Sequence, residues 1–177
     1  MITPGHARLM AAYSHWQNDS LYGAAATLSD EERKQDRGAF FGSIHGTLAH
    51  VLWGDRTWLS RFTASTAPDV GIADSPTLFE TFETLRTERE KTDAYILDWT
   101  KTMSTDDLAG DLTWFSGAAK REFTLPRWAL VTHFFNHQTH HRGQVHAMLT
   151  AAGAKPSDTD IPFMPDLDAV LSAPAAK

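Results

Sequence analysis

Histidines crowd into one short segment of this chain: five of the nine lie between His133 and His146. His137 and His141 are four residues apart, which places both imidazoles on one face of a helix, one turn apart. Two imidazoles in that arrangement can bind one metal ion. His140 competes with His141 as the partner of His137, because residues three apart also share a face. The segment therefore predicts a helical metal site, with an exposed polar face as the alternative.

A third ligand has to come from elsewhere in the chain, since a metal of this kind rarely takes only two protein ligands. His50 is the best upstream donor, although its pattern alone fits a hydrogen-bonded core histidine almost as well. Gly54 shares its helix face and would let a ligand or another backbone approach closely. His133 is a possible fourth ligand, but a packed histidine is the preferred interpretation. The remaining histidines are expected to be structural or on the surface; they are His6, His15, His45 and His146.

The composition of the chain limits its partners and the kinds of metal site it can form. The 177 residues suggest one domain, and the net charge of −6 does not favour nucleic acid as a partner. The chain has no cysteine, so a metal would need nitrogen and oxygen ligands, which suit Zn, Ni, Fe, Mn, Co or Cu. No apolar stretch is long enough to predict a membrane span, and no signal segment is apparent. The sequence predicts a cytoplasmic protein without a membrane partner.

Other polar residues admit two interpretations. Asp55 and Arg142 could be catalytic, but we expect an ion pair that joins their two helices. Asn136, Gln138 and Gln144 could orient the imidazoles. Several tryptophans are expected in the core or at the rim of a pocket above the metal; these are Trp53, Trp58, Trp114 and Trp128. No nucleophile motif, phosphate loop or helical carboxylate pair indicates another chemistry.

Helical periodicity predicts the elements that would position these side chains. Apolar spacing indicates helices over about 4–18, 42–63, 75–103 and 126–152, with Gly153 ending the last. Ser29 is predicted to cap a short connector, residues 63–75 to form a loop, and residues 86–91 to form a solvated charged face. Residues 111–124 flank Ser116-Gly117 with β-favouring types and predict a hairpin. We therefore expect an all-α, up-down four-helix bundle with this insertion and an irregular proline-containing tail.

The chain resembles the DinB family, the DinB/YfiT-like group of small helical metal-binding proteins. Tyr13–Asn18 is similar to the first-helix motif of that family, and Gly38–Leu59 resembles its second-helix signature. Phe135–Gln144 resembles its fourth-helix signature, and Asp160–Pro165 its closing segment. The likeness covers about residues 3–167 of a single domain spanning 1–177. It implies a four-helix bundle, a homodimer and a three-histidine metal site at His50, His137 and His141.

Family members of known activity imply a reaction class. They include thiol-dependent transferases and isomerases that use glutathione, bacillithiol or mycothiol. The resemblance thus implies an S-transferase that activates a low-molecular-weight thiol on a divalent ion, Zn or Ni first and Fe or Mn as alternatives. Arg142 or another cation near the mouth would hold a carboxylate of that thiol. Two alternatives stay open, a metal-dependent hydrolase that activates water and a non-catalytic metal-binding protein of the stress response.

Overall fold

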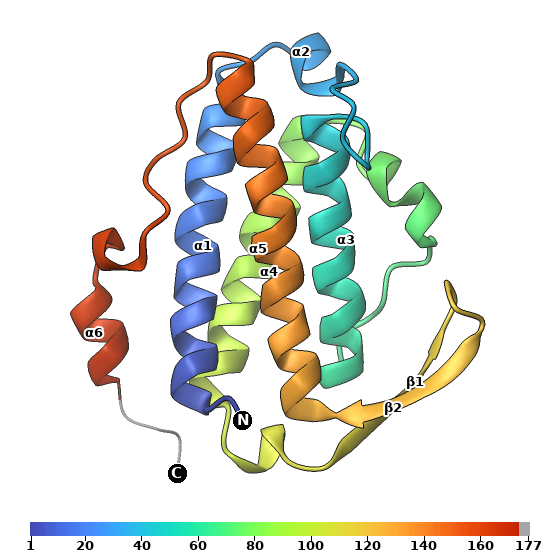
Figure 1. Ribbon diagram of the computed structural model, residues 1–177, viewed down its shortest axis with the longest axis vertical. Coiled ribbons are helices and arrows are strands. Elements are labelled where there is room, and N and C mark those ends of the chain that lie inside the picture. The colour runs from blue at the N-terminus through green and yellow to red at the C-terminus, as the bar shows by residue number, and fades with distance from the viewer. Residues whose placement is uncertain (174–177) are drawn as a thin grey trace.

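A computed structural model describes residues 1–173, which form a mostly helical protein with one small sheet (Figure 1). Four long helices pack along one another and contribute both parts of the hydrophobic core. In chain order the elements are α1 (Pro4–Ala26), α2 (Asp30–Lys34), α3 (Ile44–Phe62), η1 (Ile72–Thr77), α4 (Phe82–Thr102), η2 (Asp106–Leu108), β1 (Asp111–Ser116), β2 (Arg121–Pro126), α5 (Arg127–Ala151), η3 (Ile161–Phe163) and α6 (Leu167–Ser172).

The first helix is longer than its sequence suggests. Thr3 caps it and the helix begins at Pro4, as the predicted range 4–18 requires, but α1 continues past residue 18 to Ala26. The polar residues near Asn18 indicate a helix end, whereas Asn18 is buried and donates hydrogen bonds from its side-chain amide to Asp93 on α4. A satisfied buried amide does not interrupt a helix, so the polar break is an interhelical contact.

The connection between α3 and α4 changes the predicted topology. It runs back along α3, since Ser75 contacts His50 and Phe79 contacts His45, so α4 starts beside the beginning of α3. Both helices then point the same way (Figure 1), and the strictly alternating up-down order is wrong. The 19 residues between Phe62 and Phe82, even with η1 among them, are enough to span a helix of this length. The predicted helix start at residue 75 is part of η1, and α4 begins only at Phe82.

Parallel α3 and α4 share a buried charge network. Arg89 binds Asp55 of α3 at 2.5 Å and Asp93 at 2.7 Å, and all three side chains are almost fully buried. Two sequence expectations are therefore wrong: the charged segment 86–91 is not wholly solvated, and Asp55 pairs with Arg89 rather than with Arg142. Arg142 instead donates to Gln138 and Thr139 of its own helix. Periodicity could not distinguish Arg89 from its exposed neighbours.

The hairpin and the tail complete the fold. Strands β1 and β2 pair antiparallel and place Trp114 opposite Phe123, as the predicted hairpin requires. The tail runs along α1, where Gln17 and Tyr13 donate to the carbonyls of Asp158 and Thr159. It also contains the short helices η3 and α6, which the sequence did not predict. Within residues 1–173, no helix combines the length and apolar character that a membrane crossing needs.

Candidate metal centre

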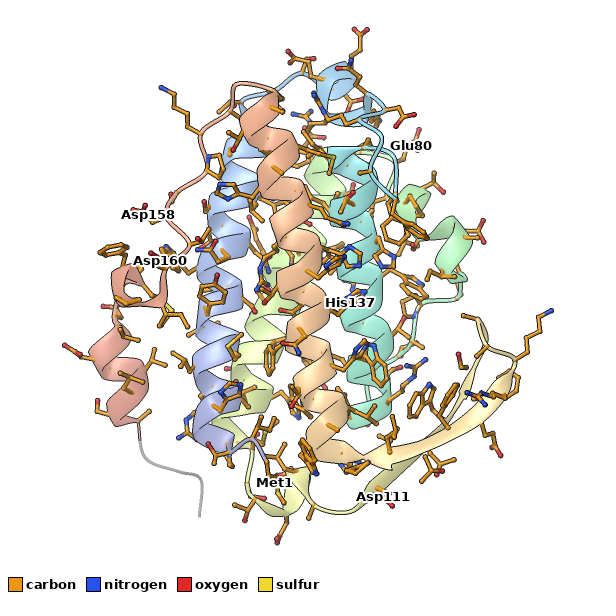
Figure 2. All side chains as sticks on the ribbon, in the orientation of Figure 1. Met1, Glu80, Asp111, His137, Asp158 and Asp160 are labelled. Carbon is orange, nitrogen blue, oxygen red and sulfur yellow. The ribbon has the colours of Figure 1, made fainter. Side chains whose placement is uncertain are left out.

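Three histidines converge between α3 and α5. His50, His137 and His141 each offer one ring nitrogen, and these nitrogens all lie within 4.8 Å of one another. Figure 2 shows His137 between the two helices, about midway along them. The Nε2 atoms of His50 and His137 are 3.2 Å apart. Ligand nitrogens on a tetrahedral zinc ion are separated by about 3.3 Å, so this pair already has a chelating separation.

Gly54 allows this convergence. A Cβ atom at this position would lie 2.7 Å from Cε1 of His137, far closer than side chains tolerate. Because Gly54 is one helical turn after His50, its missing side chain lets the His137 ring approach α3 beside His50. The expectation that Gly54 permits a close approach is confirmed, and the approaching group is an imidazole.

Hydrogen bonds orient two of the rings. Ser75 donates its only hydroxyl proton to the carbonyl of Ile72 at 2.7 Å, so at 2.9 Å it accepts from Nδ1 of His50. Nδ1 of His141 donates to Oε1 of Gln144 at 2.7 Å. Both rings therefore present the lone pair of Nε2 towards the cluster, as metal-binding histidines do. Gln144 orients an imidazole as predicted, whereas Gln138 serves Arg142 instead.

Electrostatics keep the cluster uncharged. Burial, together with the neighbouring His141, lowers the pKa of His50 to about 3. Burial and the surrounding histidines lower the pKa of His137 to about 3 as well. Neutral imidazoles are the form that binds a metal. Nδ1 of His137 is buried without a hydrogen-bond partner among the described residues. The donor set and its protonation state thus fit a divalent ion.

Aromatic rings enclose His50. Phe41 stacks on it with ring centroids 3.6 Å apart, and Trp53 stacks at 5.5 Å. Phe41 also meets the edge of His141. It reaches the cluster from the tight turn before α3, in which Gly38 and Gly42 have positive φ. Neither Phe41 nor Ser75 was recognised from the sequence, because only the folded loops bring them to the histidines.

The other histidines lie outside the cluster. His133 is exposed on one side and meets Trp58 edge-on at 5.0 Å, consistent with a packed residue. His140 is exposed, although its ring touches that of His141. His45 is buried and hydrogen-bonded to the carbonyl of Phe79, a structural role. Of the two competing pairs on α5, His137 with His141 is the one that approaches His50.

Together, the fold and these side chains define a small helical protein whose three clustered histidines could hold a metal ion. The sequence model of the DinB family matches residues 1–173, and the chain belongs to that family. It is 28% identical over 154 residues to Protein DinB of Bacillus subtilis strain 168, covering 84% of this chain and 87% of that protein. A DinB-like protein from Bacillus cereus ATCC 10987, solved at 2.01 Å, has a similar fold. Its TM-score is 0.61 at 18% identity, over 81% of this chain and 91% of that one.

Proposed function

We propose that His50, His137 and His141 bind one divalent metal ion, with zinc or nickel preferred, in an enzyme that uses a low-molecular-weight thiol. The observation that carries this is the convergence of three imidazoles, two of which, His50 and His137, line a cavity. A metal held by three histidines, with a coordination position left open, is typical of catalytic rather than structural sites. The bound ion would lower the pKa of a thiol and stabilise its thiolate at neutral pH.

The residues of the chain have defined tasks in this proposal. Ser75 and Gln144 hold two imidazoles in the binding tautomer, and Gly54 makes room for the third. Phe41 and Trp53 stack on His50, which is almost fully buried. Since the chain has no cysteine, the thiol would arrive as a cosubstrate. Its sulfur would bond to an electrophilic carbon while the leaving group departs with its electron pair.

Metal content tests the first part of the proposal. Elemental mass spectrometry of the untagged protein should find about one ion per chain, and His50→Ala, His137→Ala and His141→Ala should each lose it. His140→Ala is the matched control: it removes an exposed histidine from the same helix and should keep the metal. Wild type that stays empty after exposure to Zn, Ni, Fe and Mn would contradict the site.

Thiol consumption tests the second part. With the ion in place, we expect saturable loss of glutathione, bacillithiol or mycothiol in the presence of an electrophile, and no loss with His137→Ala. Ester or lactone cleavage without added thiol would instead identify a hydrolase. If metal raises the melting temperature but no tested compound is converted, the protein would be a non-catalytic metal-binding protein, such as one of the stress response.

Two further features stay predictions. A homodimer should appear in light scattering coupled to gel filtration as a mass near twice the 19.7 kDa of one chain. A cytoplasmic location is checked by cell fractionation.

A further inference from the structure

A cavity of about 690 Å³ opens beside the histidine cluster. His50 and His137 line it near the middle of α3, and the β1–β2 hairpin lines it near Trp58 and Arg61. Three indole rings, those of Trp53, Trp58 and Trp114, line it among small residues. A space of this size accepts a small organic molecule, and flat indole walls favour a planar apolar one.

Arg61 is the charged exception in this wall. Its guanidinium lies 4.3 Å from the ring centroid of Trp58 and 5.8 Å from that of Trp114. Burial lowers the pKa of Arg61, and the charge of Arg61 helps to lower the pKa of His133 across the cavity. Among residues 1–173 no carboxylate forms a salt bridge with Arg61, and none lines the cavity.

This placement is unusual for a protein of net charge −6. The other arginines of α3 and α4 have carboxylate partners: Arg56 contacts Glu88, Arg86 contacts Glu90, and Arg89 is bound twice. A half-buried guanidinium facing an aromatic cavity without an acid retains its capacity to bind an anion. Arg61 therefore provides a binding group that the proposed metal site does not use.

The spacing along α3 sets the length of a suitable ligand. His50, Trp53, Gly54, Thr57, Trp58 and Arg61 all line the cavity and follow one face of the helix. Arg61 is eleven positions after His50 on α3, which is about 16 Å of helix rise. Long helical side chains lean towards the helix start, which brings the guanidinium closer to the histidines. The His137 ring lies against Gly54, which is seven positions before Arg61 or about 10 Å of helix rise, so a ligand of about 10 Å would reach from Arg61 to His137.

We propose that this cavity binds the acceptor substrate, a molecule with a planar apolar body and one carboxylate. Arg61 holds the carboxylate, the tryptophans enclose the body, and the opposite end points towards His50 and His137. The role of this ligand as acceptor substrate rests on the proposed function, but the binding of such anions to the cavity does not depend on the metal.

Calorimetry on the full-length, metal-free protein tests the proposal with 1-naphthylacetate as the probe. We expect saturable binding, with 1-naphthylacetamide and acetate each at least 10-fold weaker because one lacks the charge and the other the planar body. Arg61→Gln should weaken 1-naphthylacetate at least 10-fold and leave 1-naphthylacetamide unchanged, while Arg61→Lys should retain part of the affinity. Circular dichroism confirms that the variants are folded.

Arg121→Gln is the matched control. Arg121 lies on the hairpin over Phe123 but does not line the cavity, so its loss should change affinity less than 2-fold. Equal losses with Arg61→Gln and Arg121→Gln would overturn the site in favour of general charge attraction. Equal affinity for acid and amide would overturn it too, as would binding that requires metal and ignores Arg61.

The outcomes separate this proposal from the proposed function. If the chain binds metal and consumes thiol but ignores 1-naphthylacetate, the cavity assignment fails alone. If 1-naphthylacetate binds through Arg61 while no metal or thiol activity is found, the cavity stands and the enzyme proposal fails.

Discussion

Replacing Gly54 by alanine should separate metal binding from stability. The new methyl group would lie 2.7 Å from Cε1 of His137, whereas ordinary contact begins near 3.4 Å, so the ring must retreat by about 0.7 Å. Metal–ligand distances tolerate only about 0.2 Å. Because His137 borders the cavity, its ring can move into that space without unfolding the helix. We therefore expect metal affinity to fall at least about 10-fold, or about 1.4 kcal/mol, with the fold retained.

The matched control is Gly143→Ala on α5. Gly143 is also in a helix interior, but a methyl group there would meet nothing within 4 Å. It should stabilise the metal-free protein by up to about 1 kcal/mol through helix propensity and leave metal affinity unchanged. Gly54→Ala gains the same stability from helix propensity but loses part of it by displacing His137. Its increase in the free energy of unfolding should therefore be smaller.

Competition with a chromophoric chelator measures the affinity, and urea unfolding of the metal-free protein measures the stability. If Gly54→Ala bound the ion as tightly as wild type and was stabilised as much as Gly143→Ala, the close approach of His137 to α3 would have no bearing on a metal. The reasoning about the site would then be refuted, even if the three histidine variants lost the ion.

Three further predictions concern stability and metal removal. Asp55→Ala should lower the free energy of unfolding, measured by urea titration, by about 3 kcal/mol. This is the low end for breaking a buried ion pair, because Arg89 retains its ion pair with Asp93. A loss below about 1 kcal/mol would contradict a buried network. Burial lowers the pKa of His45, so the unfolded state binds the proton more tightly and stability is lost as pH falls below about 6.5. Between pH 7.5 and pH 5.5, His45→Gln should remove up to about 1.4 kcal/mol of that loss of stability, and a variant whose pH profile equals that of the wild type would refute the assignment. Chelation of the purified protein should lower its melting temperature, and restoring zinc should reverse this in wild type but not in His141→Ala.

The composition and the local patterns of the chain determined much of the candidate site. Four-residue spacing alone puts His137 and His141 on one face, because the pitch of a helix is set by the backbone. The lack of cysteine limits a metal to nitrogen and oxygen ligands. Helix α5, the Ser29 cap and the hairpin also followed from local signals that need no distant partner.

Only the tertiary structure decided which distant groups meet. The sequence could not show that the 63–81 connection returns along α3, and this return brings Ser75 to His50 and sets α4 parallel to α3. It placed Arg89 in a solvated run and paired Asp55 with the wrong arginine, because charge alone does not show which face of a helix is covered. It also left Arg61 unnoticed, since a guanidinium becomes a binding group only when folding puts it in an aromatic cavity without an acid. Local spacing follows from backbone geometry, whereas partnership across the fold depends on how the helices pack.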